Sequence, residues 1–282
     1  MIMKKFEQRY LFSGKLTLRT GLHIGGGDAS LGTTDSPVVR RADGQPFIPG
    51  SSFKGSFRST VEKLAMTVGA RSCGMVEGEG CVGAQGEEQK QFNQRRQTDE
   101  WNEANLITVL KTAQCETCWL FGSPYIASRI FFSDLYLAAG EDSIIERRDG
   151  VAIDRDSERA VDKLLYNYEV VPATLTFTFE IMLEDPQNND LSLTCLGLSE
   201  FVSGFGGLGG KRSRGLGNCQ INELTLHVLD LSVDDAAERA KRLKKYLLGK
   251  TPAEKMTVVS NPVAFLDQQI EALLSQAGGQ HA

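Results

Sequence analysis

Hydrophobic and polar residues alternate in four segments of the chain, and this period of two is typical of half-buried β-strands. The alternation is clearest over Thr174–Glu184, where a large apolar side chain occupies every second position. Weaker alternation predicts strands over Gln8–Thr20, Ile130–Leu137 and Cys219–Leu229. The apolar positions of the clearest strand are Leu175, Phe177, Phe179, Ile181 and Leu183.

Apolar residues recur at helical spacing in four other segments. The first segment follows Pro49 and Gly50, which favours a helix start with Ser51 or Ser52 as the N-cap. Its apolar stripe consists of Phe53, Phe57, Val61, Leu64 and Val68. The other three helices are predicted over Asp190–Ser203, Asp234–Leu248 and Pro262–Ser275.

Without the last two helices, the order of elements is strand–helix–strand–strand–helix–strand. This order predicts an α+β fold of the ferredoxin-like (RRM-like) type, which many RNA-recognition domains share. A loop over Gly21–Pro37 and a hairpin over Val38–Ile48, turning at Asp43 and Gly44, precede the first helix. Residues 69–124 form a polar insertion with a short helix predicted over Trp101–Leu110, and the charged stretch Glu141–Leu165 is predicted to be exposed.

The composition is that of a globular protein, with 41% hydrophobic and 24% charged residues among 282. The sequence contains no run of about 18 apolar residues, so it predicts no membrane span. The N-terminus lacks the apolar segment of a signal peptide. We therefore expect a cytoplasmic protein that has no membrane partner. The net charge of −5 departs from the basic balance of most nucleic-acid-binding proteins. Such binding would depend on three local clusters: Arg40/Arg41, Lys54/Arg58 and Lys211/Arg212/Arg214.

The third cluster lies in a glycine-rich stretch, residues 204–218. A Walker-type phosphate loop is excluded, because Phe205 replaces its first glycine and Arg212 replaces the Ser or Thr after the lysine. The stretch fits the dinucleotide pattern G-x-G-x-x-G, but it follows a predicted helix and precedes a strand, which reverses the order of that motif. These exclusions leave a nucleic-acid strand, or solvent alone, as what the loop faces.

Lys54 and Arg58 lie one turn apart near the start of the first predicted helix. The free N–H groups and the dipole at that end of a helix already attract phosphate. The two cations therefore indicate a second phosphate-binding element, and an ordinary solvated helix face is the alternative.

Four of the six cysteines, Cys73, Cys81, Cys115 and Cys118, lie in the insertion over residues 69–124. A Cys-x2-Cys pair with two further cysteines matches tetrahedral zinc ligation, and a structural Zn²⁺ could replace the core that this polar insertion lacks. The alternatives are four reduced structural cysteines or, in an exported protein, two disulfides. The three histidines are scattered along the sequence and form no recognisable catalytic motif.

Asp35 lies between a glycine-rich loop and the predicted hairpin, directly before Ser36 and Pro37. A carboxylate beside a phosphate-binding surface could help to deprotonate an RNA 2′-hydroxyl, or bind a divalent ion that does so. Aspartate is a weak base at its ordinary pKa of about 4, which favours the metal-assisted mode. The alternative is a turn residue that hydrogen-bonds its own backbone before proline.

Three segments together resemble the RAMP superfamily, and specifically the backbone subunit of type III CRISPR RNA-guided effector complexes. They are GLHIGGGDASLGTTDSPVVRRADGQPFIPGSSFKGSFRSTVEKLA (residues 21–65), EVVPATLTFTFEI (169–181) and GFGGLGGKRSRGLG (204–217). The resemblance implies a ferredoxin-like palm that lies along the guide CRISPR RNA. It also implies a thumb hairpin and a head-to-tail filament with other effector subunits. On this basis residues 1–232 form the RAMP domain, with a zinc-binding insertion over 69–124 and a thumb over 141–171, and residues 233–282 form a C-terminal helical segment.

The resemblance also implies roles for single residues. Asp35 stands where cleaving members carry the catalytic residue of an endoribonuclease that cuts target RNA with Mg²⁺ or Mn²⁺. One alternative is a non-catalytic scaffold subunit, and another, which the scarcity of histidine disfavours, is a nuclease that processes precursor guide RNA. The positions that match guide-RNA contacts are Ser51, Ser52, Lys54, Arg58, Gly207, Gly209, Gly210, Lys211, Arg212 and Arg214.

Overall fold

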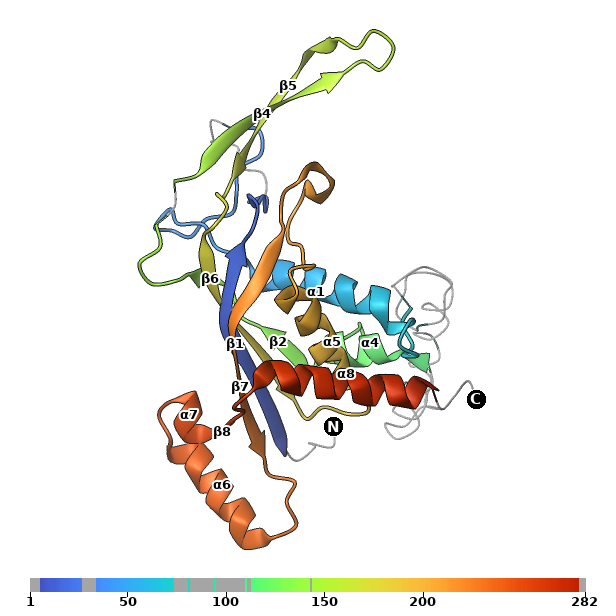
Figure 1. Cartoon of the computed structure of the whole chain (residues 1–282), viewed down its shortest axis with the longest axis vertical. Coiled ribbons are helices and arrows are strands. Elements are labelled where there is room, and N and C mark those ends of the chain that lie inside the picture. Colours follow the sequence, from blue (N-terminus) through green and yellow to red (C-terminus); the bar gives the residue numbers. More distant parts are fainter. Residues whose placement is uncertain are drawn as a thin grey trace.

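A computed structural model describes residues 6–26, 34–73, 81, 94, 110, 113–142 and 144–278. Its centre is an antiparallel sheet around β1 (Gln8–Leu18), which pairs on one side with β6 (Thr176–Glu184) and on the other with β7 (Cys219–Asp230) (Figure 1). At the outer edges, β2 (Ile130–Phe132) and β3 (Tyr136–Leu137) pair with β6, and β8 (Thr257–Val258) pairs with β7. The strand order β2-β6-β1-β7-β8 gives a mixed α/β structure with an antiparallel sheet, as the element order predicted.

Three helices cover one side of this sheet: α1 (Gly50–Ala65), α5 (Asp190–Val202) and α8 (Pro262–Gly278) (Figure 1). Phe53 of α1 packs edge-on against Phe201 of α5 with ring centroids 5.3 Å apart, and Phe57 stacks on the same ring at 5.8 Å. A side chain at Gly197 would lie 2.5 Å from the Phe57 ring, so glycine lets α1 and α5 approach closely. The predicted stripe of α1 is therefore the face that fills the core.

The segment Glu141–Leu165, predicted to be exposed, contains most of a two-stranded antiparallel hairpin. Strands β4 (Glu146–Ile153) and β5 (Ala160–Val170) pair with each other and project from the body of the molecule (Figure 1). Large apolar side chains on the hairpin remain exposed: Val151, Ile153, Leu164 and Leu165. The hairpin thus has little core of its own and depends on contacts at its base for its orientation.

The C-terminal residues contain the two predicted helices, α6 (Ala236–Leu248) and α8, together with the short elements α7 (Pro252–Lys255) and β8. Leu266 and Leu273 of α8 belong to the main hydrophobic core, so α8 is part of the same body as the sheet. No helix in the described part of the chain is long and apolar enough to cross a membrane.

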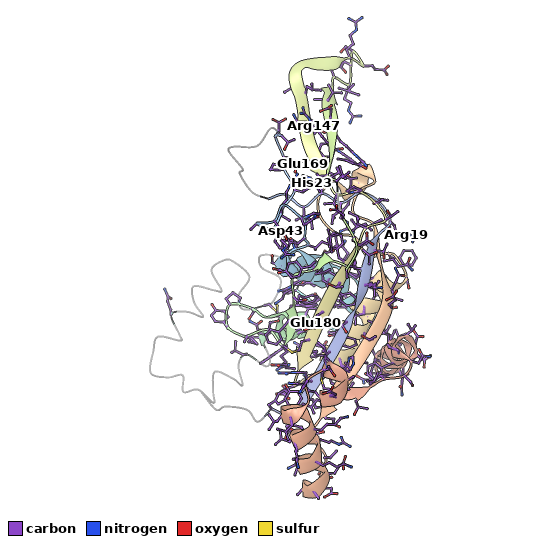
Figure 2. All side chains as sticks on the ribbon, turned by 90° about the vertical axis from the view of Figure 1, so that its left-hand side faces the viewer. Arg19, His23, Asp43, Arg147, Glu169 and Glu180 are labelled. Carbon is purple, nitrogen blue, oxygen red and sulfur yellow. The ribbon has the colours of Figure 1, made fainter. Side chains whose placement is uncertain are left out.

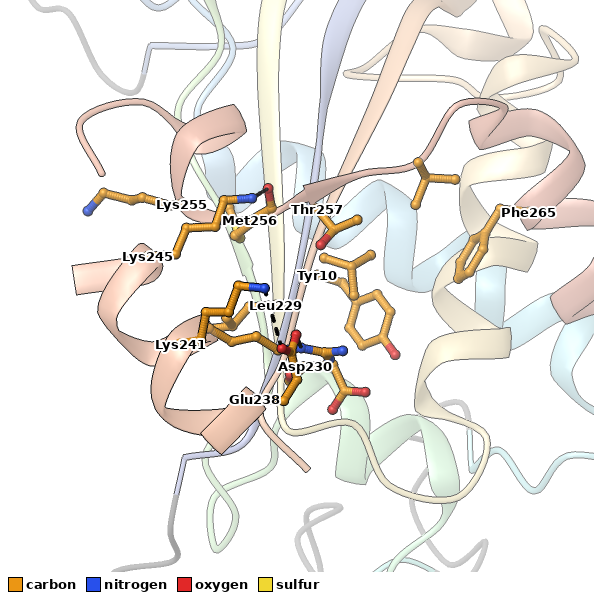
Figure 3. Close-up of a pocket in the computed structure, with 13 residues that line it drawn as sticks. Tyr10, Leu229, Asp230, Glu238, Lys241, Lys245, Lys255, Met256, Thr257 and Phe265 are labelled. Atoms are coloured by element: carbon orange, nitrogen blue, oxygen red, sulfur yellow. Dashed lines mark hydrogen bonds and ion pairs between the residues drawn. The ribbon is translucent and has the colours of Figure 1, made fainter. Parts of the chain in front are cut away.

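A pocket of about 550 Å³ lies between α6 and the edge of the sheet, at the end of the molecule opposite the hairpin (Figures 1 and 3). Tyr10 and Phe265 form part of its apolar lining, with ring centroids 6.4 Å apart. On the α6 side, Lys241 pairs with Glu238 at 3.7 Å, and Lys245 Nζ donates to the carbonyl of Met256 at 3.3 Å. Lys241 therefore pairs within α6, and Lys245 joins α6 to the residue that follows α7.

The start of α1 differs from the prediction. Its N-cap is Pro49 rather than Ser51 or Ser52, and no side chain of the N-cap residue bonds the helix. Instead the carboxylate of Asp134, which is distant in sequence, accepts a hydrogen bond from the Gly50 N–H at 2.7 Å. The strand predicted over Ile130–Leu137 is split into β2 and β3, because Asp134 turns to the Gly50 N–H and Leu135 pairs with Ile48 instead of β6.

The hairpin predicted over Val38–Ile48 is also more irregular than expected. Its turn is present, with Gly44 at φ +84° and one bridge between Arg40 and Pro46. Its far end pairs elsewhere, because Ile48 bridges Leu135. The helix predicted over Trp101–Leu110 falls almost entirely outside the described residues.

Replacing Asp134 with alanine should lower the free energy of unfolding by about 1 kcal/mol, the usual cost of losing a helix cap. Denaturant unfolding of the full chain measures this change. Asp267, an exposed carboxylate on α8, provides the matched control D267A, which should change stability by less than about 0.5 kcal/mol. Equal stability of D134A and D267A would contradict the capping role.

Candidate functional site

Asp35 is held by the base of the hairpin. Its N–H donates to Asn167 Oδ1 at 2.9 Å, and the Asn167 N–H donates to Asp35 Oδ2 at 2.8 Å. Both bonds join Asp35 to Asn167 of β5. They are therefore long-range and differ from the bond within a local turn that was the alternative for Asp35. The residue itself is exposed. The carboxylate is thus fixed in position while remaining open to solvent.

His23 lies buried next to this contact and joins three segments (Figure 2). Its Nδ1 is 2.7 Å from the carbonyl oxygen of Glu169, which can only accept, so Nδ1 carries the proton. In the neutral ring Nε2 then accepts from the Ser36 hydroxyl at 3.2 Å. The ring also packs edge-on against Tyr168 with centroids 5.8 Å apart. The sequence contains no signal for this role of His23, because the three histidines are scattered and form no recognisable catalytic motif.

Glu169 fastens the hairpin to the chain that follows Asp35. Its Oε2 accepts from the Val38 N–H at 3.0 Å and from Arg40 at 2.8 Å. Burial of this carboxylate favours its neutral form, but the bonds from Arg40 and Val38 outweigh burial and hold the pKa of Glu169 below its ordinary value of 4.5. The ionised form therefore stabilises the junction.

The glycine-rich loop lies against the backbone of residues 21–24. The Gly210 N–H donates to the His23 carbonyl at 2.9 Å. Gly209, at φ +71°, could not carry a side chain, since a Cβ would overlap the same carbonyl oxygen. Gly217, at φ +83°, is equally restricted, because a Cβ there would overlap the carbonyl oxygen of Leu208. At both positions glycine is required by a close approach of the chain to itself.

The loop cations point toward two tyrosines of the hairpin. Lys211 Nζ lies 4.4 Å from the ring centroid of Tyr168 and 5.3 Å from that of Tyr166. Arg214 donates to the Tyr166 hydroxyl at 2.8 Å. Arg212 instead folds back over Gly207, where a Cβ would lie 2.7 Å from its Nε. Sequence reasoning did not identify these tyrosines, although their i, i+2 spacing already put them on one face of a strand.

Helix α1 touches the glycine-rich loop through the Ser56 hydroxyl, which donates to the Gly207 carbonyl. Ser51 is exposed and Ser52 is half-buried near the start of the helix. Lys54 donates to Ser128 Oγ at 3.0 Å, and burial together with the nearby charge of Arg58 lowers the pKa of Lys54. The structure thus brings Asp35, Lys211 and Arg214 to the hairpin base, whereas the Lys54 ammonium is bound to Ser128.

The four cysteines of the insertion come together. Cys73, Cys81, Cys115 and Cys118 are buried, and their sulfurs all lie within 4.8 Å of one another. Zinc–sulfur bonds of about 2.3 Å in a tetrahedron place sulfurs about 3.8 Å apart, and Cys73 Sγ lies 3.6 Å from Cys118 Sγ. All six cysteines of the chain are described, and none forms a disulfide. The cluster could bind a metal ion.

The thiols of the cluster hydrogen-bond to one another. Bonds from Cys118 and Cys81 lower the pKa of Cys115, so its sulfur is the first to lose a proton. The same sharing raises the pKa of Cys118 and raises that of Cys81 to about 12. A bound metal would take the place of the shared protons. Within the described residues, this is the one group of three or more His, Cys, Asp or Glu side chains that could hold a metal ion.

Comparison with known proteins identifies the class to which this fold and site belong. The model of the RAMP superfamily matches residues 15–220. Because the match covers most of the chain, the protein belongs to the RAMP superfamily.

Among curated proteins, the chain is similar to several described as CRISPR system Cms endoribonuclease Csm3. The one from Methanocaldococcus jannaschii is 27% identical over 241 residues, which cover 77% of this chain and 80% of the relative. The protein from Enterococcus italicus is 53% identical over 53 residues, 18% of this chain and 25% of the relative. The one from Streptococcus thermophilus is 48% identical over 56 residues, 19% and 26% of the two chains.

The junction at Glu169 predicts a pH-dependent stability. Because the pKa of Glu169 is lowered in the folded state, its contribution is present above the ordinary value and is lost as pH falls through the folded pKa. At pH 7, E169Q should be less stable than the unmodified chain by about 1–2 kcal/mol, because it replaces the charged acceptor of two partly exposed hydrogen bonds. Denaturant unfolding should show the difference shrinking as pH is lowered below about 4.

The control for this measurement is E223Q, which removes an exposed carboxylate paired with Lys15 and should have little effect at any pH. A difference between E169Q and the unmodified chain that stays constant from pH 7 downward would contradict the assignment.

Proposed function

We propose that this chain is the guide-RNA-binding backbone subunit of a type III CRISPR effector complex, and that it cleaves complementary target RNA through Asp35 with the help of Mg²⁺ or Mn²⁺. The observation that carries the proposal is the reciprocal pair between Asp35 and Asn167. It holds an exposed carboxylate where the loop, the hairpin and the glycine-rich stretch meet. The names of the curated relatives agree with membership of such a complex.

The palm in this proposal is ferredoxin-like. Strands β7, β1, β6 and β2 lie side by side in that order and are all antiparallel, and α1 and α5 connect them on one face. We take residues 1–232 as the RAMP domain, 69–124 as its metal-binding insertion, 141–171 as the thumb and 233–282 as a C-terminal addition. Copies of the palm stack head-to-tail along the guide RNA, with other effector subunits at the ends of the filament.

The guide strand is bound by its backbone, because a subunit that serves any guide sequence cannot read bases. The proposed contacts are the start of α1, at Ser51, Ser52 and Lys54, and the glycine-rich loop over Gly207–Arg214. Lys211 and Arg214 supply positive charge at Tyr166 and Tyr168, the residues of β5 on either side of the Asn167 that holds Asp35, and we place the target strand at this part of the hairpin. Such clusters allow RNA binding by a chain whose net charge is −5.

The chemistry at Asp35 follows from its position. Cleavage needs a proton to be removed from a 2′-hydroxyl and negative charge to be balanced on the neighbouring phosphate. A divalent ion would supply a Lewis acid for both tasks. The Asp35 carboxylate would hold such an ion or accept the proton itself. Asn167 prevents the carboxylate from turning away, and Lys211 and Arg214 draw the phosphate toward it.

Replacing Asp35 with asparagine should lower the rate of target cleavage by about 10²–10⁴-fold, the range for loss of a catalytic acid or base. The assembled complex is incubated with matched target RNA and Mg²⁺, then with Mn²⁺, and cleavage and RNA affinity are measured together. Affinity should stay within about twofold, because phosphate contacts supply it. The matched control is D43N, which alters an exposed turn aspartate and should cut normally.

Unchanged cleavage by D35N would reject the catalytic role. Intact binding by an unmodified complex that never cuts matched RNA would instead support the scaffold alternative.

We also propose that the four-cysteine cluster holds a structural Zn²⁺. Elemental analysis of the purified full chain should find about one zinc per chain, and C118S should lose most of it. Cys219 is a buried core cysteine outside the cluster, so C219A should retain the metal. Less than about half a zinc per chain in carefully prepared unmodified protein would contradict the site.

A further inference from the structure

Arg58 lies one turn after Lys54 on α1, but its side chain faces the cysteine cluster. Its Nη2 is 3.6 Å from Cys118 Sγ, its Nη1 donates to the Gly122 carbonyl at 3.2 Å, and its Nε donates to Glu62 Oε1 at 2.7 Å. The guanidinium lies 5.8 Å from the Phe121 ring centroid, and only 16% of the side chain is exposed. Arg58 is therefore already surrounded by protein partners.

The charge of the proposed metal site explains this arrangement. Four thiolates around Zn²⁺ carry a net charge of −2, and a buried charge is costly unless it is hydrogen-bonded or paired. The Cys115 N–H lies 2.9 Å from Cys81 Sγ, and Thr117 Oγ1 lies 3.2 Å from Cys115 Sγ. Both of these donors are neutral. The contact from Arg58 to Cys118 Sγ, by contrast, brings a positive charge to the cluster.

We propose that Arg58 is a positioning residue of the four-cysteine metal site, where its guanidinium donates an N–H···S hydrogen bond to the Cys118 thiolate and balances the charge of the bound ion. The inference rests on the zinc site proposed above. It differs from the sequence-based expectation, which placed Arg58 with Lys54 in the RNA surface.

The same guanidinium also connects the metal site to the palm. Gly122 is the C-cap of α4 (Glu116–Phe121), the short helix that carries Cys118. Through one side chain, α1 is thus bonded both to the end of α4 and to a metal ligand. Three of the five N–H donors of Arg58 are directed at Glu62, Gly122 and Cys118, whereas Ser51 at the start of the helix is open to solvent.

The test replaces zinc with Co²⁺ in the full chain and compares three variants. R58M keeps the length of the stem but loses the charge and the donors, R58K keeps the charge alone, and K63Q removes an exposed charge from the same helix. R58M should bind metal about 10–100-fold more weakly in a chelator competition, as is usual when the partner of a metal ligand is lost. R58K should fall between R58M and the unmodified chain, and K63Q should match the unmodified chain.

The cobalt spectrum separates a bond to sulfur from simple packing. Loss of the N–H···S bond makes the thiolate a better electron donor, so the sulfur-to-cobalt charge-transfer band of R58M should move to longer wavelength. A merely structural role would leave that band in place. Far-UV circular dichroism of the same samples confirms that each variant is folded, and R58K provides a milder substitution if R58M is not.

The outcomes distinguish this inference from the zinc proposal itself. If the unmodified chain shows no tetrathiolate cobalt spectrum, the metal site is wrong and the role of Arg58 falls with it. If the spectrum appears and R58M has the same band position and the same metal affinity as the unmodified chain, the metal site stands and the role of Arg58 is rejected. Equal losses in R58M and K63Q, or a loss of RNA affinity in R58M with an unchanged cobalt spectrum, would reject it as well.

Discussion

The contact between the glycine-rich loop and the backbone of residues 21–24 is the constraint on which the hairpin base depends. The Gly210 amide donates to the carbonyl of His23, and the Gly217 amide donates to the carbonyl of Gly21. The imidazole of His23 then bonds both Glu169 and Ser36. Together, the two backbone hydrogen bonds and the two bonds of the imidazole hold the glycine-rich loop, the hairpin and the chain that carries Asp35 in fixed relative positions. The close packing of the loop requires glycine at positions 209 and 217.

Much of the fold could be predicted because its main elements carry repeating patterns. Strands β1, β6 and β7 and helices α1, α5, α6 and α8 are each nine residues or longer, which is enough for a period to be recognised. The elements β3, α7 and β8 have two to four residues and depend on partners elsewhere in the chain. The same limit applies to the cap of α1, since no local pattern indicates that Asp134 will replace a serine hydroxyl.

The candidate site divides in the same way. The position of Asp35 before Ser36, and the Cys-x2-Cys pair, are local signals that the sequence displays. The partners of these residues give no such signal: Asn167 lies just beyond the charged segment Glu141–Leu165, in the stretch that the resemblance assigned to a thumb without naming a role for it. Arg58 gives a further example: its spacing from Lys54 indicated phosphate, but no local pattern indicated its contacts with Gly122 and Cys118, about 60 residues later.

The exposed hairpin has a mechanical consequence. Strand β5 has eleven residues, which corresponds to about 36 Å at 3.3 Å per residue, and a two-stranded ribbon of this kind has little stability of its own. Tyr166 and Tyr168 contact Lys211 and Arg214 at its base, so the orientation of the ribbon depends in part on these two cations. A phosphate that binds these two side chains would compete with their contacts to the tyrosines. Because the ribbon is long, a small rotation at its base displaces its tip by a larger distance. The position of the tip is therefore sensitive to what binds the cations of the glycine-rich loop.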